Sequence, residues 1–247
     1  MYDVYLGFKF SFAYFSRLPM PFSPDDDLSA KRVLASMLFF FPFVGLVLAG
    51  LSIGLYLLLA PMGWYAGLLS ALFYMMLYGF LHTEAVVDVV DALYASHAGK
   101  DAYEVIKEPT VGAMGMLYSV GFIIAKVGGI SYLLLHGFYA ELITISMASR
   151  LSLLLLFNLH TFRSSFSTAI KEAFSYRLFL LACVIFALPT LIIAQESIIL
   201  FFLALTLAII ISYTLKQRLG FINGDLLGMT VESIEIILLI TVARLWL

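Results

Sequence analysis

Charged residues are scarce in this sequence. Only 12% of its 247 residues are Asp, Glu, Lys or Arg, whereas a soluble domain carries about 25%. The formal net charge is -2, so we expect no nucleic-acid partner, because such proteins usually carry a basic surface. The single cysteine, Cys183, excludes a disulfide bond within the chain.

Several familiar motifs are also missing. There is no Walker loop, no zinc-ligand spacing and no nucleophile elbow, so these signatures of nucleotide hydrolysis, zinc binding and serine-type hydrolysis are absent. No internal repeat is visible. The first residues lack the basic region of a signal peptide, and we expect no cleavage there.

What the sequence has in abundance is apolar length. Hydrophobic residues make up 63% of the chain, and the mean hydropathy is +1.04. We expect an all-α, polytopic integral membrane protein forming one transmembrane domain over residues 1–247. Each of seven apolar runs is near the roughly 20 residues that a bilayer requires. They cover Ser36–Ala60, Gly63–Leu81, Val111–Leu135, Tyr139–Leu159, Leu178–Ala194, Ser197–Leu215 and Leu226–Leu247.

Three polar segments flank these runs. Residues 1–32 are aromatic but too short before Pro19 to span, which predicts an interfacial or re-entrant helix. The acids from Asp25 to Asp27 follow Ser23 and are expected to cap the next helix, with a metal site as the less favoured alternative. The other two segments, 82–110 and 216–228, are a predicted acidic helix with its loop and a Gly-Asp loop.

Lysine and arginine predict the orientation. They lie before the first run and in alternate connections after it, whereas the connections near Pro61, His136 and Gln195 have none. The positive-inside rule therefore predicts a cytoplasmic N-terminus and a cytoplasmic position for every long polar segment. An active site would have to be built from these inner connections and the adjoining helix ends.

One acidic stretch stands out in such a chain. Glu84, Asp88 and Asp91 are spaced by four and three residues, so a helix places them on one face. Three stacked anions repel one another unless a cation lies between them, and carboxylate oxygens suit Mg²⁺. The alternative is an ordinary solvated helix face, which is the commoner role of clustered acids.

Other acids lie in the last segment. Asn223 and Gly224 form a turn signal, and Asp225 opens the final apolar run. Glu232 and Glu235 lie deeper in that run, where acids are costly and are either functional or paired with a base. Two further residues, Lys126 and Arg150, could be their partners, so a structural charge pair is an equal alternative.

The middle segment supplies further candidates. His82 precedes the acids and could act as a general base or contact phosphate; an interfacial hydrogen-bonding role is as well supported. Lys107 and Glu108 could offer a cation to phosphate and an anion to metal, or form a surface ion pair.

These residues together resemble the cobalamin synthase family, the integral-membrane adenosylcobinamide-GDP ribazoletransferases. The resemblance covers nearly the whole chain. It is carried by the order and spacing of several pieces, and Ala85 and Ala92 stand where the family has glycine. The matching pieces are residues 15–21, residues 41–45, the stretch from His82, residues 108–115, Ser149-Arg150, residues 223–228 and Glu232.

The resemblance implies a reaction. α-Ribazole, or its 5'-phosphate, displaces GMP from adenosylcobinamide-GDP, giving adenosylcobalamin or its phosphate, with Mg²⁺ as cofactor. It implies a multi-pass protein of the cytoplasmic membrane of a bacterium or archaeon; a homo-oligomer is left open. The implied roles are catalysis by Asp88, Asp91 and His82, metal binding by Glu84, Asp88, Asp91 and Asp225, and substrate binding by Arg17, Lys107, Glu108, Arg163, Asn223, Gly224 and Glu232.

Two other classes of function compete with this one. Another acid-rich membrane transferase, of the CDP-alcohol phosphotransferase or prenyltransferase kind, would have tighter motifs that are not intact here. A secondary transporter could use Lys126, Arg150, Glu232 and Glu235 as an ion path, and would be expected to show inverted repeats.

Overall fold

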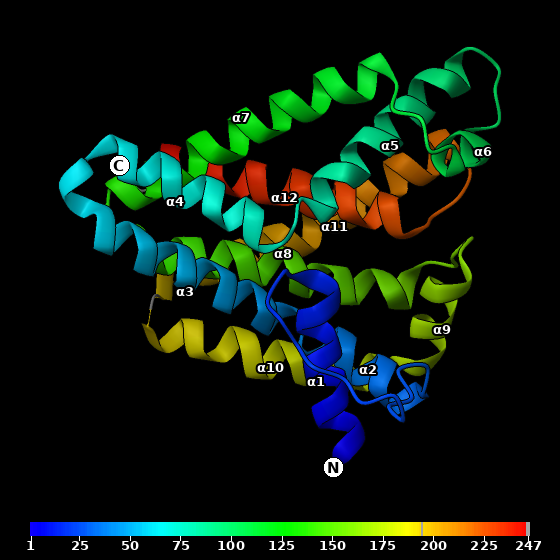
Figure 1. Cartoon of the computed structure of the whole chain (residues 1–247), viewed down its shortest axis with the longest axis horizontal. Coiled ribbons are helices and arrows are strands. Elements are labelled where there is room, and N and C mark those ends of the chain that lie inside the picture. The colour runs from blue at the N-terminus through cyan, green and yellow to red at the C-terminus, as the bar shows by residue number, and fades with distance from the viewer. Residues whose placement is uncertain (194, 246–247) are drawn as a thin grey trace.

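The computed structural model describes residues 1–193 and 195–245, and the regular structure of this part is entirely helical (Figure 1). The all-α prediction is therefore confirmed. The α-helices are α1 (Tyr2–Phe15), α2 (Lys31–Phe39), α3 (Phe41–Leu59), α4 (Trp64–Leu77), α5 (Leu81–His97), α6 (Ala102–Lys107), α7 (Ala113–Leu135), α8 (Tyr139–Leu159), α9 (Ser165–Ala173), α10 (Tyr176–Ile193), α11 (Ile198–Leu219) and α12 (Gly224–Leu245). Two short 3₁₀ turns, Ala60–Met62 and Gln195–Ser197, join α3 to α4 and α10 to α11.

The membrane-spanning character is also confirmed. In the described part of the chain, five helices are long and apolar enough to cross a bilayer: α3 with its 3₁₀ turn, α7, α8, α11 and α12. Two bent pairs, α4 with α5 and α9 with α10, raise the number to seven if each pair forms one span. The predicted ends of the fifth and seventh runs, at Ala194 and Leu247, lie outside the described residues.

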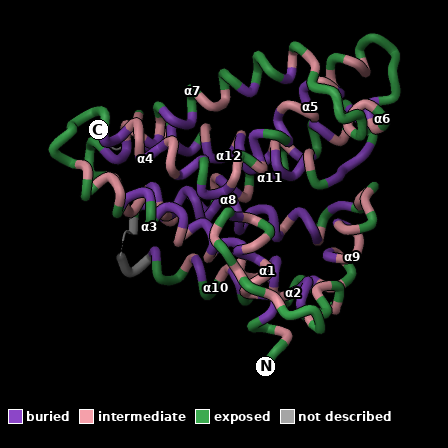
Figure 2. Tube along the Cα trace, viewed as in Figure 1, coloured by how far each residue is buried: buried purple, intermediate pink, exposed green. Residues whose placement is uncertain are grey.

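Helices α8 and α12 form the centre of the bundle. In the most apolar window of each helix, 78% of α8 and 61% of α12 is buried, compared with 33% for α3, α7 and α11. Figure 2 shows the same arrangement, with buried segments concentrated in the middle of the molecule. A helix that is apolar all round belongs inside a bundle, so α8 is surrounded by protein while the outer helices face lipid.

Small residues allow α3 and α8 to approach closely. Gly45 of α3 lies directly against the backbone of Ser146, and a side chain at this position would overlap it. Ser149 and Ser152 of α8 are buried and donate hydrogen bonds to backbone carbonyls three residues earlier. Such small-residue contacts are the usual way in which helices pack tightly without water.

The α4–α5 junction is a sharp bend of 77°. Gly79 has a φ of +64° and is followed by Phe80 at +56°, so both residues adopt left-handed backbone conformations. A side chain at Gly79 would also overlap the Arg17 side chain, which lies against it. The bend turns α5 out of the direction of α4 and brings its first residues over α12.

The N-terminal region differs in detail from the prediction. The first apolar run is divided at Phe40, and α3 begins at Phe41 with Pro42 in its first turn, where proline favours a helix start. The expected cap on the preceding helix is wrong: α2 begins at Lys31 without a side-chain cap. Instead, Asp27 accepts hydrogen bonds from the amide and hydroxyl of Ser29, which lower the pKa of Asp27 and stabilise a local turn.

The connections sort into two ends of the bundle. Those that join α5 to α7, α8 to α9 and α11 to α12 lie together at the right of Figure 1. Those that join α3 to α4, α7 to α8 and α10 to α11 lie at the left. The basic connections predicted to share one side of a membrane therefore occupy one end of the molecule, which we call the basic end.

Candidate active site

Three chain segments that are distant in sequence meet at the basic end. The hydroxyl of Tyr103 in α6 donates a hydrogen bond to the carbonyl of Arg163, over 2.7 Å. The amide of Arg163 in turn donates to the carbonyl of Ile222, just before α12, over 2.8 Å. These two bonds tie the acidic segment, the α8–α9 connection and the Gly-Asp loop into one structural unit.

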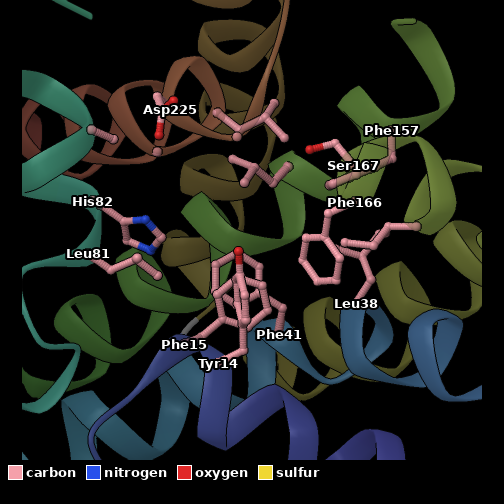
Figure 3. Close-up of a pocket in the computed structure, with 16 residues that line it drawn as sticks. Tyr14, Phe15, Leu38, Phe41, Leu81, His82, Phe157, Phe166, Ser167 and Asp225 are labelled. Atoms are coloured by element: carbon pink, nitrogen blue, oxygen red, sulfur yellow. The ribbon is translucent and has the colours of Figure 1, made fainter. Parts of the chain in front are cut away.

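Beside this unit lies a cavity of about 120 Å³, bounded by α1, α2, α3, α5, α8, α9 and the start of α12 (Figure 3). Its walls are largely aromatic and aliphatic. Tyr14, Phe15 and Phe41 gather at one edge, and Phe166 packs beside them with its ring centroid 5.3 Å from that of Tyr14. His82, Ser167 and Asp225 bring polar atoms to the wall, so the cavity combines an apolar body with a few polar groups. Such a combination is typical of a small-molecule site.

His82 lies in the first turn of α5, immediately after the bend. Its ring is stacked on Tyr78, with centroids 5.6 Å apart, and stands edge-on to Phe41 at 6.0 Å. The side chain is buried, and within the described structure its Nε2 atom has no hydrogen-bond partner. A buried ring nitrogen without a partner is costly, and Nε2 is shielded by its neighbours, so the ring is held in place by its packing against Tyr78 and Phe41.

The acidic row of α5 extends from His82 towards the basic end. Asp88 is half-buried and interacts electrostatically with Asp225 of α12 and with Glu84. Among the described residues, none of these three carboxylates has a basic partner within ion-pair distance. The structure thus brings together three of the four predicted metal ligands as a cluster of uncompensated anions.

The cluster can be tested for its fit to Mg²⁺. Within the described residues, no three His, Cys, Asp or Glu side chains are close enough to form a complete metal cage. Mg²⁺, however, is commonly bound by only one or two carboxylates together with water and substrate phosphates. The carboxylates of Glu84, Asp88 and Asp225, which lack basic partners in the described structure, therefore fit Mg²⁺ if the phosphates of a substrate supply the remaining ligands.

Asp91, the fourth predicted ligand, also interacts electrostatically with Asp88, but its carboxylate is engaged by another helix. Its two carboxylate oxygens accept hydrogen bonds from the amides of Gly112, over 2.6 Å, and Gly115, over 2.8 Å. These amides begin α7, so Asp91 caps this helix from the side of α5. Side chains at either glycine would overlap the carboxylate, which explains why glycine suits both positions.

Glu232 and Glu235 form a buried ion network that we call the charge cluster. Lys126 lies 2.6 Å from Glu232 and 2.7 Å from Glu235, and Arg150 lies 2.6 Å from Glu235. All four side chains are almost completely buried. The predicted pairing partners are therefore confirmed.

Two tyrosines complete the charge cluster. Tyr78 donates to Glu232 over 2.6 Å, and the Tyr74 hydroxyl accepts a hydrogen bond from Arg150 over 3.2 Å. None of the four charged residues borders the cavity. The ring of Tyr78, however, is also stacked on the ring of His82, which lines the cavity. Tyr78 therefore connects the charge cluster to the cavity wall.

Two of the predicted phosphate contacts meet on one aromatic ring. The guanidinium of Arg163 lies 3.8 Å from the ring centroid of Tyr103, and the ammonium of Lys107 lies 4.1 Å from it. Both cations are exposed, and Lys107 also pairs with Glu104 at 3.1 Å. They form a positively charged rim at the basic end.

The remaining predicted residues are divided between the cavity and its surroundings. Gly224 borders the cavity directly. Asn223 accepts a hydrogen bond from the amide of Leu226 and donates one to Asp225, so it caps α12 and orients the carboxylate. Arg17 is exposed at the α4–α5 bend, and Glu108 is exposed, with Thr110 as its hydrogen-bonding neighbour.

Sequence reasoning missed the aromatic part of the site. Tyr103 was not singled out, although it holds both rim cations. Tyr14 was attributed only to an interfacial helix, and Phe15 only to that helix and to a family-like segment, yet both line the cavity. The available signal was the dense run of aromatic residues in the first helix, but apolar aromatics in a membrane protein do not by themselves distinguish a cavity from a lipid-facing surface.

The fold and the site define a multi-pass helical membrane protein with an acid-flanked cavity at its basic end. The family described as cobalamin-5-phosphate synthase matches residues 7–243, and the chain belongs to this family. The adenosylcobinamide-GDP ribazoletransferase of Brevibacillus brevis is 28% identical over 251 residues, covering 98% of this chain and 99% of the relative. The protein of the same name from Chlorobium chlorochromatii is 30% identical over 221 residues, covering 84% and 86%. No solved structure matches the chain.

Proposed function

We propose that this protein transfers the cobinamide-phosphate part of adenosylcobinamide-GDP to α-ribazole or its 5'-phosphate, releasing GMP. A ribazole hydroxyl oxygen forms a bond to the phosphorus that carries the cobinamide. The bond from that phosphorus to the GMP oxygen breaks, and the hydroxyl proton passes to the protein. Family membership and two relatives named for this activity support the proposal.

The observation that carries the proposal is the position of Asp225. This carboxylate borders the cavity and also interacts with Glu84 and Asp88 on the facing helix. A substrate hydroxyl in the cavity would therefore lie beside the acids that face the phosphates. We assign Asp225 as the proton acceptor, because a general base must be within reach of the proton that it removes.

Glu84 and Asp88 are the residues that would hold Mg²⁺. They lie one turn apart on the same face of α5 and have no basic partner in the described structure. A divalent cation supplies charge neutralisation to the pyrophosphate and the departing phosphate. We assign Asp91 to the α7 cap, since its oxygens already accept two backbone hydrogen bonds.

The rim supplies positive charge for the GDP part of the substrate. Arg163 and Lys107 are held by the Tyr103 ring near the start of α12, where they can pair with phosphate oxygens. Arg17, at the α4–α5 bend, is a third candidate. Phosphoryl transfer depends mainly on positioning and charge stabilisation, which this division of residues provides.

We further propose that the basic end faces the cytoplasm and that the N-terminus lies on the same side, in the inner membrane. The grouping of the basic connections at one end supports this orientation through the positive-inside rule.

The reaction is tested by GMP release from washed membranes that contain the full chain. GMP release that requires adenosylcobinamide-GDP, α-ribazole and Mg²⁺ is expected, and a chelator should abolish it. Membranes with the Asp225→Asn variant should release GMP about 10²–10⁴ times more slowly, the usual contribution of a general base. Wild-type membranes that contain folded protein but release no GMP would contradict the proposed reaction.

A further inference from the structure

We infer that the cavity is the binding site for the aromatic base of the ribazole substrate, an inference that rests on the proposed function. The corrin ring and the guanine nucleotide are then bound outside it. The size of the base would accordingly decide which nucleosides the cavity accepts.

The cavity is small. It measures about 120 Å³, somewhat less than an apolar cavity of about 150 Å³ in another protein that is known to bind benzene. A space of this size admits a single aromatic ring of the base. A corrin macrocycle, which is many times larger, has to remain at the membrane surface or against the outside of the bundle.

The walls of the cavity are mainly aromatic and aliphatic. Phe15 and Phe41 are stacked with centroids 3.9 Å apart, and Phe166 packs against Tyr14 at 5.3 Å, so the four rings form one aromatic wall. Leu153 and Ile170 supply aliphatic surface between the rings. A flat aromatic group binds well against such a wall, because ring–ring contacts add to the free energy of burying apolar area.

The polar groups of the cavity suit a ribazole base better than guanine. The edge of guanine carries several hydrogen-bond donors and acceptors, each of which would need a partner inside the cavity. The cavity offers few polar side chains for that purpose: Tyr14, His82, Ser167 and Asp225. A base with apolar edges and one unsubstituted ring nitrogen matches this supply, because the imidazole of His82 can share one hydrogen bond with it.

The position of Asp225 indicates where the ribose of the nucleoside would lie. Asp225 borders the same cavity as His82 but belongs to the first turn of α12, next to the basic end. Figure 3 shows His82 and Asp225 on one side of the cavity, separated from each other along its wall. A nucleoside with its base near His82 can therefore direct its ribose hydroxyls towards Asp225 and the acids of α5.

Leu153 provides the test of base selection. Its replacement by alanine enlarges the cavity, and one methylene in an apolar pocket changes discrimination by about 10- to 200-fold. In membranes that contain the full-length Leu153→Ala variant, the ratio of kcat/KM for a larger to a smaller benzimidazole riboside should rise at least about tenfold. Leu154→Ala is the matched control, because Leu154 is a buried neighbour that does not border the cavity.

The outcomes separate the inference from the proposed reaction. If wild-type membranes release GMP and Leu153→Ala leaves the base preference unchanged, the base binds elsewhere and the inference is wrong. If no riboside supports GMP release in the wild type, the proposed reaction itself fails. Should Leu153→Ala not accumulate in the membrane, Ile170→Val enlarges the same cavity by a smaller amount. The ratio of kcat/KM for a larger to a smaller riboside should then rise as well, by a smaller factor.

Binding without turnover gives a second test. Radiolabelled α-ribazole should bind to wild-type membranes in the absence of adenosylcobinamide-GDP, and excess GMP should not displace it. His82→Phe keeps an aromatic ring against Tyr78 but removes both ring nitrogens. The Kd of this variant for α-ribazole should therefore rise about tenfold, as expected for one lost hydrogen bond. Competitive displacement by GMP would assign the cavity to guanine instead.

Discussion

The ammonium of Lys126 in α7 lies 2.6 Å from the carboxylate of Glu232 in α12, and both side chains are buried. Together with Arg150 and Glu235 they give two positive and two negative charges, so the charge cluster is formally neutral. A neutral and fully buried set of charges is tolerated inside a membrane protein, whereas any one of them alone would be expensive.

Breaking this cluster should destabilise the protein strongly. Lys126→Met leaves two carboxylates facing one arginine, so we expect the free energy of unfolding to fall by about 3–5 kcal/mol. The double variant Lys126→Met/Glu232→Met should regain part of this loss, because Glu235 keeps Arg150. Unfolding of the purified protein in detergent measures both. Strict additivity of the two substitutions would contradict the described pairing.

Asp91 and Asp88 should behave differently although they lie on one helix. Asp91→Ala removes the cap on α7 and should lower the free energy of unfolding by about 0.5–2 kcal/mol, the usual value for a lost helix cap. The Mg²⁺ dependence of GMP release should be unchanged in the molecules that remain folded. A stable Asp91→Ala protein that has lost its response to Mg²⁺ would restore Asp91 to the metal site, as the sequence predicted.

The rim cations should act on one substrate only. Arg163→Gln removes a positive charge from the Tyr103 ring, and we expect KM for adenosylcobinamide-GDP to rise about tenfold, since a charged hydrogen bond contributes about 1.5–3 kcal/mol. KM for α-ribazole should stay within about twofold. Lys100→Gln is the matched control, because it removes an exposed cation from the same end without touching Tyr103. An equal effect of both variants would indicate general electrostatic attraction rather than a defined contact.

The orientation can be measured with single cysteines. In a Cys183→Ser background, a membrane-impermeant thiol reagent should label His136→Cys in intact cells, because the α7–α8 connection lies at the end away from the basic connections. Lys100→Cys should be labelled only in inverted vesicles. The reverse labelling pattern would place the proposed active site outside the cytoplasm.

The sequence predicted the architecture well, for physical reasons. Apolar runs of spanning length are visible without a structure, and the alternation of basic connections predicted which ones share an end of the bundle. The partners of Glu232 and Glu235 could be inferred because buried acids need bases and the apolar runs contain few. Lys126 and Arg150 were the available candidates.

The finer features depended on packing that the sequence does not encode locally. Asp91 was grouped with Asp88 by helical spacing, but its role is set by Gly112 and Gly115, more than twenty residues later in the chain. The cavity walls come from seven different helices, so no single stretch indicates them. The division of the first apolar run at Phe40 was signalled by Pro42, a helix-start residue that was not used in placing that run.

The most direct measurement is the Mg²⁺ titration of GMP release by washed membranes that contain the wild type or the Asp88→Asn variant, with both substrates present. If the acids of α5 hold the metal beside the cavity, the wild type should saturate with Mg²⁺. Asp88→Asn, present in the membrane in equal amount, should need a much higher Mg²⁺ concentration or fail to respond. Identical titration curves for the two proteins would contradict the assignment of this acidic face to the active site.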